Sequence, residues 1–457
     1  MKILILGAGQ VGSTVAESLV GEANDITIVD TDPAKLRLLQ DRFDLRTLVG
    51  NASHPTVLEK AGIADADMLL AVTQSDEVNM VACKLAASLY NTPTKIARIR
   101  ATDYLEHPAI FSADNFCVDF SICPEQILTD YICKLIEFPE ALQVLEFAGG
   151  RVSLVAVRIF EGGSLVGNAL HNLSAHIPQI DTRVAAIFRQ DGPIIPEGDT
   201  VIEVGDEIFF IAATENIRTV MKELRRMDRP AKRVMIVGGG NIGRRLALAM
   251  ENDYQVKLIE YNKKSCERLA GELSRTLILN GDGTDENLLN SEHVGEVDVF
   301  CALTNDDENN IMSALLAKKA GATKVVALIN RSAYVGLVQG GQIDIALSPA
   351  HVTIGSLLAY VRQGDVAVVH SLRRGAAEAL EIVAHGDRQC SAVVGRRIDE
   401  IDLPKGATIG TIVRGDKVIM GHRNTVIEAD DHVIVFVVNK KMIRKIEKLF
   451  QVGVGFF

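Results

Sequence analysis

The chain has 457 residues, of which 47% are hydrophobic and 23% are charged, and its formal net charge is −11. This length predicts about three or four domains, with enough apolar material for several cores. The acidic balance argues against non-specific nucleic-acid binding, which depends on Lys and Arg neutralising phosphates.

The apolar runs are too short to cross a bilayer, and the first of them, Ile3–Leu6, ends in glycines before a signal peptide could form. We therefore expect a cytoplasmic protein with no direct membrane insertion. The seven cysteines lack any Cys-x-x-Cys pair and the ten histidines show no close ligand spacing. Both patterns predict reduced thiols and no metal site.

The first 139 residues alternate apolar strands with amphipathic helices, which is typical of a parallel sheet covered by helices. In chain order, the predicted strands are Lys2–Leu6, Ile26–Val29, Met68–Val72 and Lys95–Arg98, and the predicted helices are Val11–Leu19, Pro33–Arg42, Pro55–Ala61 and Asp76–Tyr90. Residues 140–230 instead carry short β-rich runs at Val152–Phe160, Thr182–Arg189, Thr200–Glu203 and Ile208–Ala213. Those runs predict a small α+β domain.

A further helix is predicted from Pro124 to about Glu137, with an apolar stripe along one side. The stripe could pack on the helix's own sheet, or the helix could be an arm that packs on another domain of the same kind. Periodicity alone leaves these two alternatives open.

The whole chain is a duplication. Gly7–Gly12 returns as Gly238–Gly243, Ala71–Asn79 returns as Ala302–Asn310, and Thr200–Glu203 returns as Thr425–Glu428. The predicted fold class is α/β, a tandem duplication of a Rossmann-like doubly wound parallel-sheet N-lobe plus a small α+β C-lobe. The four lobes are predicted at residues 1–139, 140–230, 231–365 and 366–457, with the two copies joined near Arg226–Lys232.

Each N-lobe opens with a Gly-x-Gly-x-x-Gly loop between a strand and a helix, followed 17 or 18 residues later by an acid at the end of the next strand. The glycines let a backbone approach a pyrophosphate at a helix N-terminus, and the acid accepts hydrogen bonds from ribose hydroxyls and repels a 2′-phosphate. The loops and acids are Gly7, Ala8, Gly9, Gln10, Val11, Gly12 and Asp30 in the first copy, and Gly238, Gly239, Gly240, Asn241, Ile242, Gly243 and Glu260 in the second.

Other candidate residues follow neighbouring strands, where ligands bind in open α/β sheets. Thr73 and Gln74, with Thr304 and Asn305 in the second copy, are placed to contact the nucleotide, and Asn51 and Asp282 to reach the adenine. Arg98 could neutralise a phosphate, but its counterpart is Leu328, so the two sites need not bind alike. These features favour an adenosine diphosphate-type ligand with a free 2′-hydroxyl over NADP.

We find no repeated set of acid, base or nucleophile that would serve catalysis. Duplicated nucleotide sites without such a set favour a sensor over an enzyme. One alternative is an NAD-dependent oxidoreductase with unrecognised catalytic residues, and another is a scaffold with vestigial pockets.

The chain resembles proteins with tandem RCK (KTN) domains, the regulatory subunits of Trk-type bacterial potassium-uptake transporters. The resemblance spans essentially all residues and depends on the Gly7–Gly12 loop, the Asp30 strand end, the Ala71–Asn79 run and the Val234–Gly243 segment that leads to Glu260. It implies binding of NAD(H) and of ATP or ADP at the residues above. It also implies a homo-oligomeric, tetrameric ring on the cytosolic face of the inner membrane, peripheral to a membrane potassium-translocating subunit that the ring gates by conformational change.

Two details follow from the same resemblance. The helix after Pro124 resembles a crossover helix that joins N-lobes, which favours the arm over packing on its own sheet. Many members of the family have Asp where this chain has Asn51, whereas Asp282 keeps the acid, so equal affinity at the two sites is not implied.

Overall fold

The computed structural model describes residues 1–20, 24–161, 166–172, 180–190, 192–224, 230–338, 341–362, 365–372 and 377–452. The chain divides into two compact units. Unit 1 holds Met1–Thr129, Leu328–Gly336 and Leu347–Ile354, and unit 2 holds Asp130–Ala327, Leu337–Ala346 and Gly355–Phe457. Residues 226–229 of the predicted join lie outside the described residues.

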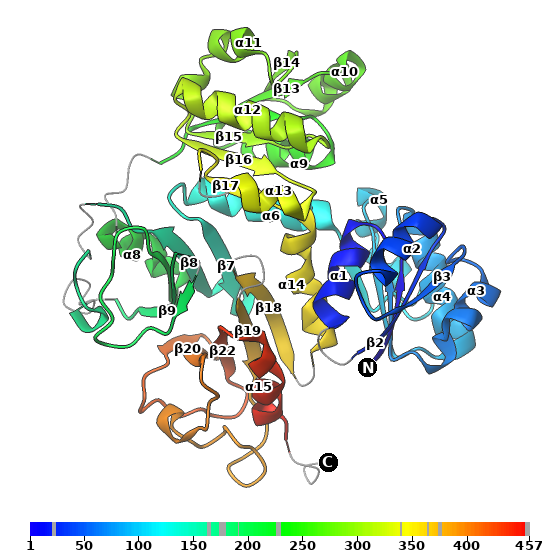
Figure 1. Ribbon diagram of the computed structural model, residues 1–457, viewed down its shortest axis with the longest axis vertical. Coiled ribbons are helices and arrows are strands. Elements are labelled where there is room, and N and C mark those ends of the chain that lie inside the picture. The colour runs from blue at the N-terminus through cyan, green and yellow to red at the C-terminus, as the bar shows by residue number, and fades with distance from the viewer. Residues whose placement is uncertain are drawn as a thin grey trace. The chain divides into compact units, whose positions relative to one another are not determined.

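The first Rossmann lobe, blue to cyan in Figure 1, is a six-stranded parallel sheet with strand order β3-β2-β1-β4-β5-β6. Its central strands are buried apolar runs, as expected for a sheet covered on both faces. The strands are β1 (Lys2–Leu6), β2 (Asp25–Asp30), β3 (Arg46–Val49), β4 (Met68–Ala71), β5 (Thr94–Arg98) and β6 (Phe120–Ile122). The helices are α1 (Gln10–Val20), α2 (Pro33–Gln40), α3 (Pro55–Ala61), α4 (Asp76–Tyr90) and α5 (Thr102–Leu105), and α6 (Pro124–Glu137) follows the sheet.

The second Rossmann lobe repeats this topology, with strand order β14-β13-β12-β15-β16-β17. Its strands are β12 (Arg233–Val237), β13 (Gln255–Glu260), β14 (Leu277–Asn280), β15 (Val299–Ala302), β16 (Lys324–Leu328) and β17 (Ile345–Leu347). Its helices are α9 (Asn241–Met250), α10 (Lys263–Glu272), α11 (Glu286–Ser291), α12 (Asp307–Ala320), α13 (Ser332–Val338) and α14 (Pro349–Val361). The predicted duplication of a doubly wound parallel-sheet lobe is therefore confirmed.

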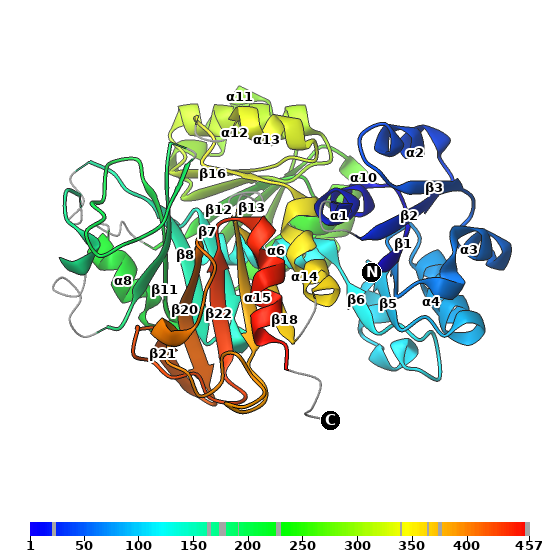
Figure 2. The ribbon, with the colours of Figure 1, turned by 60° about the horizontal axis from the view of Figure 1, so that its bottom comes forward.

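Each C-lobe is a five-stranded antiparallel sheet with a helix after it (Figure 2). The first has strand order β10-β9-β11-β8-β7 and consists of β7 (Gln143–Phe147), β8 (Val152–Arg158), β9 (Arg183–Arg189), β10 (Gly192–Ile194), β11 (Glu207–Ala213) and α8 (Ile217–Leu224). The second has strand order β18-β19-β22-β20-β21 and consists of β18 (Val366–Leu372), β19 (Ala377–Val383), β20 (Ala407–Arg414), β21 (Lys417–Met420), β22 (His432–Val437) and α15 (Ile443–Phe450). This architecture confirms the small α+β lobes.

The prediction of a strand at Thr200–Glu203 is wrong, because the segment forms no strand and contributes only an isolated bridge at Val201. The Val201 carbonyl accepts from the Arg189 guanidinium at 2.8 Å, and the Glu203 amide donates to Asp206 at 2.9 Å. Side chains therefore use backbone groups that a strand would use.

The two C-lobes share one hydrophobic core within unit 2. Phe147, Phe188 and Phe209 of the first C-lobe and Phe436 of the second belong to the same buried cluster. Hydrogen bonds add to this packing, including one between His370 Nε2 and the Glu146 carbonyl at 2.8 Å. The duplicated C-lobes therefore form one folded body.

The helix α6 begins in unit 1 and ends in unit 2. Within unit 2, Lys324 of β16 is 5% exposed, and its Nζ donates to the carbonyls of Leu135 at 3.1 Å and Ala141 at 3.0 Å. The end of α6 thus packs on the second Rossmann lobe, while Leu347–Ile354, which includes the start of α14, belongs to unit 1 with the first lobe. The structure therefore favours the second alternative for this helix, in which α6 is an arm that packs on another Rossmann lobe.

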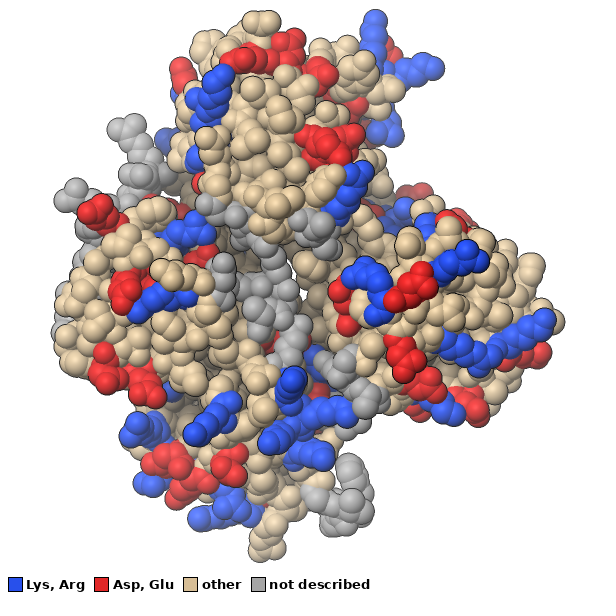
Figure 3. Space-filling view, viewed as in Figure 1, with Lys and Arg blue, Asp and Glu red and all other residues tan. Residues whose placement is uncertain are grey.

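The surface carries both signs of charge. On the face shown in Figure 3, Lys and Arg side chains are interspersed with Asp and Glu. Exposed ion pairs among the described residues include Lys319 with Glu286 at 3.5 Å, and such pairs contribute little to stability. Within the described ranges, no helix combines the length and apolar composition needed to span a bilayer.

Candidate functional site

The first glycine loop joins β1 to α1. Gly7 has φ +108°, a left-handed conformation that strains other residues, and its amide donates to the Val29 carbonyl at 2.8 Å. A Cβ on Gly12 would lie 2.0 Å from the Gly7 carbonyl oxygen, so only glycine lets the helix approach the strand. A Cβ on Gly9 would meet no heavy atom within 4 Å. Because packing does not require Gly9, the open space beside it suits the close approach of a phosphate.

The second glycine loop has the same construction between β12 and α9. Gly238 has φ +102°, and a Cβ on Gly243 would lie 1.9 Å from the Gly238 carbonyl oxygen. A Cβ on Gly240 would meet nothing within 4 Å. Gly239 differs from Ala8, its counterpart, because a Cβ on Gly239 would lie 2.4 Å from Leu269 Cδ1. Both loops therefore leave open space at the middle glycine.

The acid at each strand end holds the loop in place. Asp30 accepts the Ala8 amide at 2.6 Å and the Asp32 amide at 2.8 Å, one on each carboxylate oxygen. Glu260 accepts the amides of Gly239 and Asn262, both at 2.7 Å, in the same way. A carboxylate can accept about four hydrogen bonds, so each oxygen can still take a ribose hydroxyl. The sequence predicts a ligand-binding role for these acids, but it does not reveal that they also hold the glycine loop through its amides.

A buried asparagine positions the threonine that follows β4. Asn79 is 0% exposed, and its Oδ1 accepts the Thr73 amide at 2.9 Å and the Thr73 hydroxyl at 2.7 Å. Its Nδ2 donates to the Arg98 carbonyl at 2.9 Å, which joins the ends of β4 and β5. Asn310 holds Thr304 at the same two distances. The residue types alone do not assign these asparagines a role, although the Thr-x5-Asn spacing recurs in both copies of the duplicated run.

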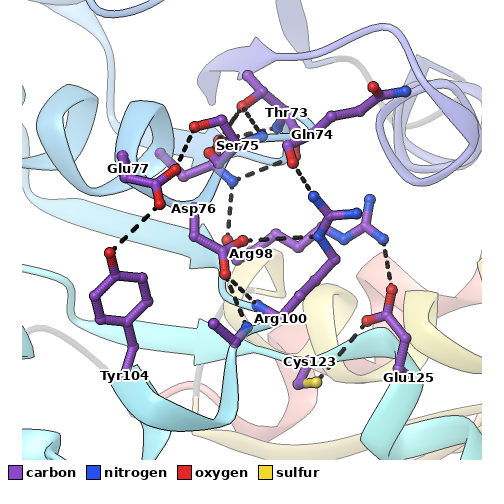
Figure 4. Close-up of polar contacts among 12 residues, drawn as sticks. Thr73, Gln74, Ser75, Asp76, Glu77, Arg98, Arg100, Tyr104, Cys123 and Glu125 are labelled. Carbon is purple, nitrogen blue, oxygen red and sulfur yellow. Dashed lines mark hydrogen bonds and ion pairs between the residues drawn. The ribbon is translucent and has the colours of Figure 1, made fainter. Parts of the chain in front are cut away.

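Arg98, the last residue of β5, and Arg100, which follows the strand, lie among acids in the first lobe (Figure 4). Arg98 forms an ion pair with Glu125 of α6 at 2.9 Å. The Arg98 Nε is buried without a hydrogen-bond partner among the described residues. Asp76 accepts the Arg100 amide at 2.8 Å, and the Arg100 side chain donates to the Gln74 carbonyl. Arg98, which the sequence predicts to neutralise a phosphate, therefore lies beside a carboxylate of the helix α6.

Glu77 lies at the start of α4, next to the segment that joins β4 to this helix (Figure 4). The hydrogen bond from the Ser75 hydroxyl, at 2.6 Å, is the main cause that lowers the pKa of the Glu77 carboxyl below its usual value. Burial raises the pKa of Tyr104, and the nearby Glu77 charge adds to that rise. Glu77 thus carries a negative charge at neutral pH, close to the helix N-terminus that favours it.

Several predicted site residues are exposed. Asn51 Oδ1 accepts from the Ser53 amide at 3.0 Å and the Ser53 hydroxyl at 2.9 Å, and Asp282 Oδ1 accepts from the Thr284 amide at 2.9 Å and hydroxyl at 2.8 Å. Asn and Asp therefore build the same turn, and the two copies differ there in charge. Gln74 and Asn305 are exposed, Gln10 and Asn241 are exposed at the starts of α1 and α9, Val11 is buried and Ile242 is half-buried.

The predicted residues gather at the carboxyl ends of neighbouring strands in each sheet. In the first lobe, Gly7 follows β1, Asp30 ends β2, Asn51 follows β3 closely, Thr73 follows β4 and Arg98 ends β5. Strands β1 and β4 are neighbours whose connections run to opposite sides, which is the switch point where ligands bind in doubly wound sheets.

Comparisons with known families cover both kinds of lobe. The TrkA-N domain family matches residues 3–117 and 234–349, and the TrkA-C domain family matches residues 154–225 and 391–451. A Halomonas elongata protein is 59% identical over 457 residues, covering 100% of both chains, and a Vibrio alginolyticus protein is 58% identical over 452 residues, covering 99% of both. Both are named Trk system potassium uptake protein TrkA.

Solved structures share the fold at low identity. The crystal structure of the GsuK RCK domain matches with a TM-score of 0.62 and 16% identity, covering 98% of this chain and 94% of that one. The GsuK channel bound to NAD matches with a TM-score of 0.62 and 15% identity, covering 98% of this chain and 79% of that one. These matches support the tandem RCK-like fold.

Proposed function

The chain belongs to the TrkA family, and we propose that it regulates a membrane potassium-uptake transporter by binding an adenine nucleotide in its Rossmann lobes. The observation that carries this proposal is the duplicated loop and acid. In both copies the acid is hydrogen-bonded to the loop, and the middle glycine, Gly9 or Gly240, stands beside open space.

We propose NAD(H) and ATP or ADP as the ligands. Asp30 and Glu260 would accept the ribose hydroxyls and disfavour a 2′-phosphate, and the loop amides would hold the phosphates. NAD on the GsuK channel, which has a similar fold, is compatible with this choice. Thr73, Gln74 and Arg98 in the first lobe, with Thr304 and Asn305 in the second, would complete the sites.

We further propose that the chain acts as a homo-oligomer, a tetrameric ring on the cytosolic face of the membrane, bound to the potassium-translocating subunit of a Trk-type transporter. The names of the relatives support the transporter partner. The division into lobes at residues 1–139, 140–230, 231–365 and 366–457 is part of the same proposal.

The arm helix α6 offers a route from ligand to movement. Glu125, at its start, pairs with Arg98, and the carbonyl of Leu135, near its end, accepts from Lys324 in unit 2. A ligand phosphate that attracts Arg98 would compete with Glu125. A ligand shifts such an equilibrium only by its differential affinity for the two states, and a full reversal needs about 5.5 kcal/mol, which several sites can share.

Calorimetric titration of the full chain with NADH, ATP and ADP tests the site. Gly9→Ala and Gly240→Ala should each weaken binding at one lobe at least about tenfold, because the added methyl occupies the phosphate approach without touching the protein. Gly271→Ala, in α10, is a matched control, since its Cβ also meets nothing within 4 Å. Binding by the double variant equal to wild type would refute the site.

Two further outcomes separate the alternatives. Wild type that binds none of the three nucleotides would favour the vestigial scaffold. Loss of nicotinamide absorbance during the titration would favour the oxidoreductase. For the regulatory role, potassium flux through the purified membrane subunit in vesicles should depend on the nucleotide only when the chain is present.

A further inference from the structure

An exposed aromatic ring stands beside the acid of the second lobe. Tyr261 follows Glu260 at the end of β13, and it is 79% exposed. Its side chain has no hydrogen bond or ring contact with the described residues. Burying such a ring is favourable, so a ligand that covers it gains affinity.

The backbone that carries the ring is fixed. Asn280, which ends β14, donates from Nδ2 to the Tyr261 carbonyl and to the Glu260 carbonyl, both at 3.0 Å. The Asn262 amide donates to Glu260 Oε1 at 2.7 Å. The segment Glu260–Asn262 is thus held on both sides of Tyr261. A held backbone reduces the conformational entropy that a ligand must remove.

We propose that Tyr261 is the base-stacking platform of the second nucleotide site and makes that lobe selective for a purine base. This inference rests on the proposed function. With the ribose hydroxyls on Glu260, the base attached to the same ribose lies within reach of the neighbouring side chain. A flat purine stacks on a phenol ring, and base–aromatic stacking contributes measurably to affinity.

The first lobe lacks this platform. Thr31 stands in place of Tyr261, and Val49, 56% exposed, stands in place of Asn280. The first lobe instead has Arg98 where the second has Leu328. The second lobe therefore recognises the base more strongly than the first lobe does.

The test isolates the second lobe by using Gly9→Ala as the background and ADP as the probe. Adding Tyr261→Thr, which installs the residue of the first lobe, should weaken ADP binding about tenfold, whereas Tyr261→Phe should keep it within about twofold. Conversely, Thr31→Tyr in a Gly240→Ala background should strengthen binding. Equal affinity of the Thr and Phe variants would overturn the platform while leaving the proposed function intact. If the Gly9→Ala background binds no ADP, the proposed function fails for the second lobe, and this inference fails with it.

A spectroscopic readout keeps the test independent of affinity. The chain has no tryptophan and seven tyrosines, so its intrinsic emission comes from tyrosine. Stacking of the purine should quench the part that Tyr261 contributes, and Tyr261→Phe should abolish this quenching while ADP still binds. The same quenching in Tyr261→Phe as in its parent would overturn the proposal.

Discussion

Replacing Asn79 by alanine should destabilise the first Rossmann lobe strongly. The side chain is 0% exposed, and its removal leaves the Thr73 amide and the Arg98 carbonyl without the partners they have at 2.9 Å. An unsatisfied buried polar group costs about 1–3 kcal/mol, so two of them predict a loss of about 2–6 kcal/mol. The Thr73 hydroxyl keeps the Ser75 carbonyl as a partner and adds little.

The assay is urea unfolding followed by circular dichroism, with amide hydrogen exchange at Thr73 as the local readout. The matched control is Asn51→Ala, because Asn51 is exposed and water can replace its contacts with Ser53, so its loss should stay below about 1 kcal/mol. Asn310→Ala should behave like Asn79→Ala. The reasoning is refuted if Asn79→Ala costs no more than the control and leaves exchange at Thr73 unchanged.

Three further predictions concern charge and the arm helix. Burial would raise the pKa of Glu251, but hydrogen bonds from residues 274–276 lower it overall. Its stabilisation is therefore present above the unfolded pKa of about 4.3 and lost as pH falls through the folded value. Glu251→Gln should melt earlier than wild type at neutral pH and converge with it in acid, and a constant gap in melting temperature would contradict this. Burial lowers the pKa of His370 despite a hydrogen bond from its ring to a backbone carbonyl. Wild type should therefore lose more stability than His370→Gln as pH falls below about 6.5, and parallel pH curves would argue against this account. Lys324→Met should cost about 2–6 kcal/mol and speed proteolysis after α6, because two carbonyls lose their donor; unchanged cleavage would count against the arm contact.

Local signals in the sequence predicted much of the fold. The bounds of α4 agree with the prediction because Ser75 caps its start, accepting the Val78 amide at 3.2 Å, and Asn91 ends it in the left-handed conformation. Strand β1 agrees because its apolar run ends at the positive φ of Gly7. Such determinants lie within a few residues of the element they define.

Contacts between distant residues could not be predicted in the same way. The segment Thr200–Glu203 has the residue types of a strand, but the Arg189 guanidinium binds the Val201 carbonyl, which a neighbouring strand would otherwise use. The carbonyl of Leu135, near the end of α6, accepts from Lys324, which lies 189 positions further along the chain, and a periodic apolar stripe does not identify such a partner. At the site, the residue types predicted the ligand chemistry, whereas the loop-holding role of Asp30 depends on geometry that only the folded chain supplies.

The exchange of segments between the two copies has a consequence for how the chain is made. Unit 1 begins at Met1 but is complete only when Leu347–Ile354 has joined it. At a synthesis rate of about 5–20 residues per second, the ribosome needs roughly 10–45 s to travel from Thr129 to Ile354. During that interval the first lobe lacks part of its packing. A nascent chain stalled before Ile354 should therefore expose apolar surface, which makes it a natural client for ribosome-associated chaperones.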